Sequence, residues 1–173
     1  MNTDNKRLRR CCFTGHRPEK LLKSETDISR VEAKIKSLLR PAVASAIQDG
    51  YITFLSGMAR GFDLWAADVV LEARAHNPEI HLICALPLMD FEKKWAPAEQ
   101  EHYNSILRQA DYVKLVSKNY YSRCFQVRNE YMVDNSARVI AAYNGTYGGT
   151  RNTINYALTR NVDVVNLLES ELL

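Results

Sequence analysis

The sequence lacks the features that mark membrane, secreted and zinc-binding proteins. No apolar run approaches the roughly 20 residues needed to cross a bilayer, and residues 1–10 are polar and basic, unlike the apolar stretch of a secretory signal. The four cysteines form no C-x-x-C pair, and the histidines have no metal-ligand spacing. We therefore expect a cytoplasmic protein with buried, reduced thiols, no membrane contact and no metal site.

A strong charge of either sign is also missing. The formal net charge of +3 is too small to indicate nucleic-acid binding by itself. Lys6, Arg7, Arg9 and Arg10 form a local basic cluster, which we interpret as a solvated arm, although it could contact phosphates. The length of 173 residues and the hydrophobic fraction of 46% are typical of one globular domain, which we place over residues 1–173.

Short apolar runs alternate with helical patterns along the whole chain. Continuous apolar strands of this kind lie in a sheet that is buried on both faces, and strand–helix alternation favours parallel pairing. The sequence therefore predicts an α/β fold: a Rossmann-like, doubly wound, mainly parallel sheet flanked by helices on both faces. Strands are expected at 10–14, 51–55, 80–86, 111–116, 138–143 and 162–167, and helices at 28–39, 43–47, 61–75, 97–109, 125–135 and 150–159, with a kink or break at Pro41.

Glycine-rich turns follow several of the expected strands. Ligands of doubly wound sheets bind outside the carboxyl ends of the strands, and the segments 15–18, 56–61, 86–88 and 145–150 fall at that edge. Glycine lets the backbone approach a phosphate closely, and helices are expected to begin after two of these turns, where free N–H groups favour an anion. The turns therefore predict a phosphate-binding site, although the G-x-G-x-x-G fingerprint of dinucleotide binding is absent.

Charged side chains in and beside these turns supply candidates for ligand contacts. Arginine suits bidentate binding of phosphate, and Asp63 is either a helix-capping acid or an acceptor for a ribose hydroxyl. His16 is a candidate hydrogen-bonding group or general acid. The residues that we expect to bind the ligand are Gly15, His16, Arg17, Ser56, Gly57, Met58, Ala59, Arg60, Gly61, Asp63, Arg128, Asn129, Gly145, Gly148, Gly149 and Thr150.

Four motifs together resemble the YpsA-like family of the SLOG superfamily, which is related to the Smf/DprA DNA-processing proteins and the LOG enzymes. Gly15-His16-Arg17-Pro18 resembles the opening motif of the YpsA-like group. Residues 56–63, S-G-M-A-R-G-F-D, resemble the S-G-x-A-R-G-x-D motif shared with DprA. Phe125, Arg128 and Asn129 resemble the F-x-x-R-N element of DprA, and Gly148-Gly149-Thr150 resembles the superfamily's last glycine-rich segment. The resemblance implies a Rossmann-like fold that recognises a nucleotide-related ligand.

The resemblance to the LOG enzymes is incomplete. Their P-G-G-x-G-T-x-x-E segment ends in a glutamate that takes part in cleaving the ribose–base bond, whereas Gly149-Thr150 is followed here by Arg151, Asn152 and Thr153. We therefore predict a non-catalytic, regulatory protein that binds a nucleotide-derived ligand such as an ADP-ribose or NAD-like phosphate compound, with no other cofactor expected.

Three alternatives remain open. One is a hydrolase of a nucleotide N-glycosidic bond, for which the acid–base candidates are His16, Glu19, Asp63 and Glu130. A second is single-stranded DNA binding resembling that of DprA, based on the basic cluster and Arg128-Asn129. The third is a partner-binding scaffold, and a homodimer fits any of these. Among the aromatic residues, Trp65 is assigned to the core, and Tyr120-Tyr121 is placed near the site, where a ring could stack on a base.

Overall fold

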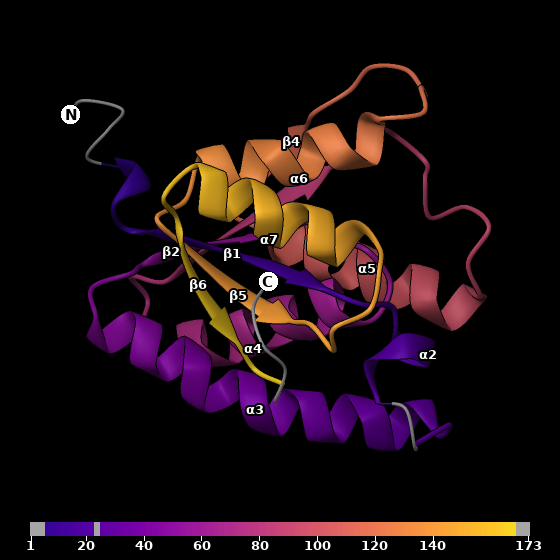
Figure 1. The fold of residues 1–173 in the computed structure, drawn as a ribbon. Coiled ribbons are helices and arrows are strands. Elements are labelled where there is room, and N and C mark those ends of the chain that lie inside the picture. The colour runs from indigo at the N-terminus through magenta and orange to yellow at the C-terminus, as the bar shows by residue number, and fades with distance from the viewer. Residues whose placement is uncertain (1–5, 23–24, 169–173) are drawn as a thin grey trace.

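A six-stranded parallel sheet lies at the centre of the molecule, with helices packed on both of its faces (Figure 1). The computed structural model describes residues 6–22 and 25–168. The strand order is β4-β3-β2-β1-β5-β6, and each neighbouring pair runs parallel. The strands are β1 (Arg10–Gly15), β2 (Thr53–Ser56), β3 (His81–Leu86), β4 (Tyr112–Leu115), β5 (Arg138–Ala142) and β6 (Asp163–Asn166).

The helices divide between the two faces of the sheet. Those that lead from β1 to β4 cover one face, and the two that follow β4 cover the other (Figure 1). The chain therefore winds outward from β1 in one direction and then crosses to β5, which is the doubly wound arrangement that the sequence predicts. The helices are α2 (Pro18–Leu21), α3 (Ile28–Gln48), α4 (Phe62–His76), α5 (Pro97–Gln109), α6 (Cys124–Asp134) and α7 (Gly149–Thr159).

Alternating residues of the central strand build two separate hydrophobic cores. Cys11 and Phe13 of β1 face the core beneath α3, α4 and α5, whereas Cys12 faces the core beneath α6 and α7. Both sets are fully buried, because a strand in the middle of a doubly covered sheet exposes neither face. The expectation of buried thiols is confirmed, since all four cysteines are free and buried.

Helix α3 corrects the expectation of a break at Pro41, because it runs without interruption from Ile28 to Gln48. Pro41 lies on the exposed side of the helix, so the Ser37 carbonyl that its missing N–H leaves unpaired is open to water. The buried stripe passes through Leu39 and Val43 on the other side and stays intact. The sequence also gave no expectation of α2, a four-residue helix that begins at Pro18, where proline is favoured.

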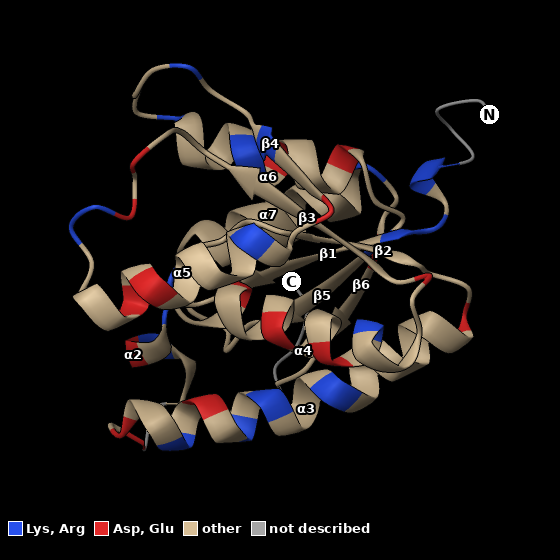
Figure 2. Ribbon diagram, turned by 180° about the vertical axis from the view of Figure 1, so that it is seen from behind, with Lys and Arg blue, Asp and Glu red and all other residues tan. Residues whose placement is uncertain are grey.

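The basic segment at the N-terminus is attached to the sheet rather than forming a free arm. The Arg7 side chain donates to the Ser136 carbonyl at 3.0 Å, and Arg9 donates to the Gly50 carbonyl at 3.4 Å. Both contacts lie at the amino ends of the strands, at the opposite end of the molecule from α2 (Figure 2). Within the described residues, no helix is both long enough and apolar enough to cross a membrane.

Candidate functional site

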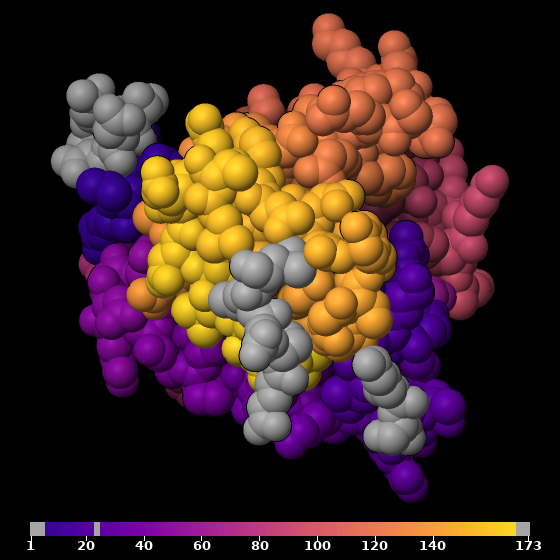
Figure 3. Space-filling view, viewed as in Figure 1, coloured from indigo at the N-terminus to yellow at the C-terminus, as the bar shows by residue number. Residues whose placement is uncertain are grey.

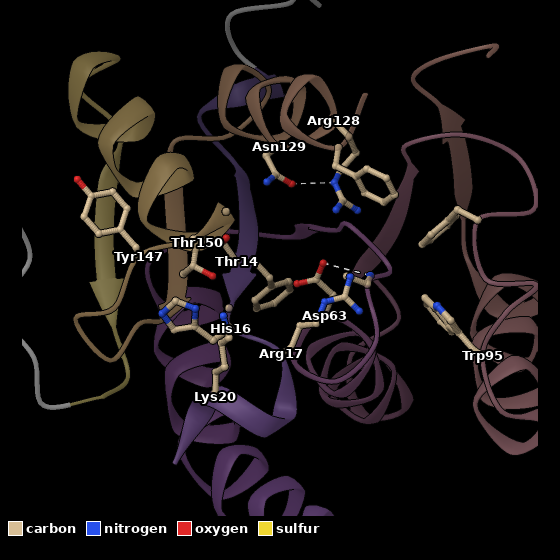
Figure 4. A pocket seen from close by; sticks show the side chains of 17 residues that line it. Thr14, His16, Arg17, Lys20, Asp63, Trp95, Arg128, Asn129, Tyr147 and Thr150 are labelled. Carbon is tan, nitrogen blue, oxygen red and sulfur yellow. Dashed lines mark hydrogen bonds between the residues drawn. The ribbon is translucent and has the colours of Figure 1, made fainter. Parts of the chain in front are cut away.

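A pocket of about 350 Å³ opens at the carboxyl ends of the strands, where β1 and β5 lie side by side. The chain leaves β1 toward one face of the sheet and leaves β5 toward the other, and this divergence is where doubly wound folds bind ligands. The segment after β5, α2 and the loop before α5 meet on this side of the molecule (Figure 3). The labelled side chains of Figure 4 surround the space between them, and the ring of Tyr147 at the rim points outward.

The beginning of α7 and the end of α2 form a basic, glycine-rich wall. Gly148, Gly149 and Thr150 line the pocket, and the first turn of α7 has neither an acidic residue nor a side-chain cap. Its free N–H groups therefore remain available to an anion. Arg17 and Lys20 line the same wall, and neither forms an ion pair within the described part of the chain.

Two threonine hydroxyls also belong to the lining of the pocket. The residues Thr14 and Thr150 are 6% and 5% exposed, and neither hydroxyl has a hydrogen-bond partner among the described residues. Both hydroxyls can therefore form a hydrogen bond to a polar ligand.

His16 lies at the bottom of the same wall. Its ring packs against Tyr143 with ring centroids 5.5 Å apart, and only 5% of the residue is exposed. The Thr146 hydroxyl donates to Asn144 Oδ1 at 2.7 Å, so its oxygen is free to accept a hydrogen bond from His16 Nε2 at 3.4 Å. Burial, and secondarily the charge of Lys20, lower the pKa of His16. The imidazole is therefore neutral near pH 7.

A buried arginine and a buried aspartate form the back of the pocket. Arg128 is 4% exposed and donates to the carbonyl oxygen of Gly57 and, through Nε, to Asn129 Oδ1 at 2.8 Å. Asp63 is 6% exposed and accepts the N–H of Ala59 at 3.2 Å. Burial raises the pKa of Asp63, and the charge of Arg128 opposes that rise. Asp63 therefore holds its own turn in place at the start of α4 and also lines the pocket, whereas its role as an acceptor for a ribose hydroxyl stays a prediction.

Aromatic side chains form the opposite wall. Phe91 packs edge-on against Trp95 and Phe125, with ring centroids at 5.4 and 6.2 Å. All three line the pocket, and Trp95 lies across it from Tyr147 (Figure 4). The sequence indicated neither Phe91 nor Trp95, because both lie in an irregular loop without periodicity. Tyr120 and Tyr121, which the sequence places near the site, do not line the pocket, and both are exposed to solvent in the loop after β4.

The turn after β2 contributes less to the pocket than its motif suggests. Only Ala59 and Asp63 of this segment line the pocket. Ser56 is buried, donates to the Asp63 carbonyl at 2.8 Å and accepts the Met58 N–H at 3.1 Å. The Arg60 side chain points away, toward Glu19 and Glu99. The expected ligand residues that do not line the pocket are Ser56, Gly57, Met58, Arg60, Gly61 and Gly145, whereas those that do are Gly15, His16, Arg17, Ala59, Asp63, Arg128, Asn129, Gly148, Gly149 and Thr150.

The acid–base candidates are also separated by the fold. Glu130 lies outside the pocket, within 3.3 Å of Arg123 and 3.2 Å of Gln126. Glu19 forms an ion pair with Arg60, also outside it. Only His16 and Asp63 of the four remain among the pocket residues.

These features define the class of protein. It is a doubly wound, Rossmann-like α/β protein with a pocket lined by glycine-rich turns, at the point where the chain leaves β1 and β5 toward opposite faces of the sheet. The chain belongs to the YspA SLOG family (YpsA), whose model matches residues 11–166. It is 29% identical over 155 residues to UPF0398 proteins of Bacillus thuringiensis (strain Al Hakam) and Bacillus cereus (strain AH187), covering 88% of this chain and 84% of each relative.

The fold is also that of DNA processing protein A. The structure of DprA from Streptococcus pneumoniae matches with a TM-score of 0.63 at 15% identity, covering 99% of this chain, which thus spans about half (54%) of the DprA chain. DprA from Helicobacter pylori, whose single-stranded DNA binding mode has been studied structurally, matches with a TM-score of 0.58 at 18% identity, covering 98% of this chain and 69% of that one.

Proposed function

We propose that this protein binds a nucleotide-derived phosphate compound in the pocket between β1 and β5, and that it acts as a sensor or regulator rather than as a catalyst. The observation that carries the proposal is the two-sided construction of the pocket. One wall offers helix N–H groups, two cations and unpartnered hydroxyls, and the other offers aromatic rings. Phosphate suits the first wall and a base suits the second.

The charge of the pocket supports an anionic ligand. Arg17, Lys20 and Arg128 line it together with a single carboxylate, that of Asp63. By contrast, most other arginines of the chain have a carboxylate within 4.0 Å, as Arg40 does with Glu72. Cations left without an acidic partner beside a helix N-terminus are stabilised when an anion arrives.

Titration calorimetry with AMP, ADP-ribose and NAD tests the proposal directly. At least one of these compounds should bind, and Lys20→Ala should weaken its binding about tenfold, because a charged hydrogen bond contributes about 1.5–3 kcal/mol. Lys34→Ala is the matched control, since Lys34 is exposed on α3 and does not line the pocket. No binding of any of the three compounds, or equal losses in both variants, would contradict the proposal.

Trp95 provides a second, optical test. A base that stacks on the aromatic wall should change the fluorescence of Trp95, whereas Trp65 is buried in α4 and should not respond. Trp95→Phe should therefore abolish the signal change and preserve binding. Chromatography of the calorimetry samples also tests for catalysis, because release of free base from the bound nucleotide would show that the N-glycosidic hydrolase is the right function.

Single-stranded DNA binding is a second candidate, favoured by the rim of the pocket. Tyr147 is 79% exposed and stacks on the Arg151 guanidinium at 4.2 Å, and Phe125 is 39% exposed. Exposed rings beside cations are typical of surfaces that bind single strands. A labelled thymidine oligomer should then bind with an affinity that falls steeply with salt, and Tyr147→Ala should weaken it. Absence of binding at low salt would exclude this function.

A further inference from the structure

Arg60 lies in the most specific motif of the sequence, yet its side chain is outside the pocket. The backbone of the turn passes the pocket at Ala59, whereas the Arg60 side chain lies in a separate crevice beside Pro18 and Glu99. Arg17 and Arg128, which do line the pocket, have no carboxylate within 4.0 Å among the described residues. Arg60 has two, so its charge is already compensated.

The two carboxylates that Arg60 contacts belong to opposite walls of the pocket. Glu19 lies in α2, the helix that carries Lys20 and follows Arg17. Glu99 lies in the first turn of α5, directly after the loop that carries Phe91 and Trp95, and approaches Arg60 Nη1 at 3.5 Å. Glu99 also accepts the N–H of Ala96 at 3.2 Å, which fixes its position at the start of α5. One guanidinium therefore connects the basic wall to the aromatic wall.

Helix α2 needs such a connection. A helix of four residues is not stable by itself, and α2 is placed by contacts of its side chains with the rest of the protein. Leu21 is buried in the core, and Pro18 packs so closely on Gly61 that a Cβ at Gly61 would lie 2.4 Å from the proline ring. The ion pair of Glu19 with Arg60 adds a polar contact that holds α2 against the turn after β2.

We infer that Arg60 is a positioning residue: it does not touch the ligand but holds α2 and the start of α5 together, so that the two walls of the pocket are spaced for one ligand before it arrives. This inference rests on the proposed function. A site held in its binding arrangement binds more tightly because the ligand does not have to order it. The motif arginine then acts on affinity through Glu19 and Glu99.

Hydrogen exchange of the ligand-free protein tests the connection without any ligand. The Lys20 amide donates to the Arg17 carbonyl at 2.9 Å, and the Trp95 amide donates to the Glu92 carbonyl at 2.8 Å, so one amide reports on each wall. Arg60→Gln should speed exchange at both about three- to tenfold. Arg138→Gln is the matched control, because Arg138 also bridges two carboxylates, Asp49 and Asp163, at the amino end of β5, opposite the end where the pocket opens. It should leave both amides unchanged.

Affinity for AMP or ADP-ribose, measured by calorimetry, completes the test. Arg60→Gln should weaken binding about three- to tenfold, and Arg60→Lys should keep part of the affinity that Arg60→Gln loses. Glu19→Gln should cause little further loss of affinity when it is combined with Arg60→Gln, because both changes break the same contact.

Two results would overturn the inference. Weakened binding with unchanged exchange at Lys20 and Trp95 would show that Arg60 contacts the ligand. Faster exchange with unchanged affinity would show that the walls need no fixed spacing. If neither compound binds the unaltered protein while exchange responds as expected, the proposed function fails and the connection between the walls stands.

Discussion

Two glycine-rich turns of this protein look alike in sequence and differ in what surrounds them. The turn after β2 is filled by the protein itself: a Cβ at Gly57 would lie 2.4 Å from Arg128 Nη1 and 2.7 Å from Asp63 Oδ2. The turn after β5 is open, since a Cβ at Gly145 or Gly149 would meet nothing within 4 Å. Glycine thus serves close packing in the first turn and leaves room for another molecule in the second.

Gly57→Ala should have the largest effect on folding. Its methyl group would displace the buried Arg128 guanidinium or the Asp63 carboxylate, and overpacking around buried charges costs about 3 kcal/mol. Urea denaturation should show that loss of unfolding free energy. Gly149→Ala is the matched substitution in the open turn and should stay within about 0.5 kcal/mol of the parent, because alanine is a better helix former at that position. Equal losses of unfolding free energy in the two variants would show that the two turns do not differ in packing.

Ser56→Ala should destabilise the filled turn by a smaller amount. The Ser56 hydroxyl accepts the buried Met58 N–H and donates to the Asp63 carbonyl, so its removal leaves an unsatisfied donor at a cost of about 2 kcal/mol. Thr146→Ala provides the comparison in the open turn, where water can replace the lost bond to Asn144 and less than about 1 kcal/mol is expected. Thermal unfolding of both variants at one pH measures the loss of stability in each. A larger loss for Thr146→Ala than for Ser56→Ala would contradict this prediction.

Gly149→Ala, in the open turn after β5, should weaken ligand binding and leave the stability of the fold nearly unchanged. A methyl group at the start of α7 keeps a phosphate away from the helix N–H groups, and the affinity for AMP or ADP-ribose should fall about tenfold, equivalent to about 1.4 kcal/mol. Calorimetry measures the affinity, and the denaturation curve of the same sample shows whether the fold is intact. Unchanged affinity would place the phosphate elsewhere.

The smallest expected effect concerns pH. Burial lowers the pKa of His16 in the folded protein below its unfolded value of about 6.5, so the unfolded chain takes up the proton first as the pH falls. The contribution of His16 to stability is therefore complete above about pH 6.5 and is lost as the pH falls from there through the folded pKa. His16→Gln should flatten the pH dependence of the unfolding free energy in that window. His76→Gln, at an exposed position of α4, should leave it as it was.

The fold was largely predictable from the sequence, whereas the pocket was predictable only in part. Buried strands and amphipathic helices follow from local periodicity. The start of α5 at Pro97 follows from the preference of proline for the first position of a helix. Pro41 misled because its effect depends on which side of α3 it occupies. The glycines marked the end of the sheet where the pocket opens, but the sequence does not say whether the space that a glycine leaves is filled by Arg128, as at Gly57, or left open, as at Gly149. The aromatic wall was missed because Phe91 and Trp95 lie in an irregular loop, and Phe91 meets Phe125 only through tertiary packing.

The pairing of β1 with β5 also determines the order in which the protein can be assembled. Cys11 lies opposite Arg138, so the partner of the central strand leaves the ribosome more than a hundred residues later. Until then one edge of β1 has only water for its backbone groups, and an unpaired strand edge invites association with other chains. The same late contact slows folding, since a distant pairing costs loop entropy before it gains any bonds. A ligand that contacts residues after both strands can therefore bind only once synthesis has passed the beginning of α7.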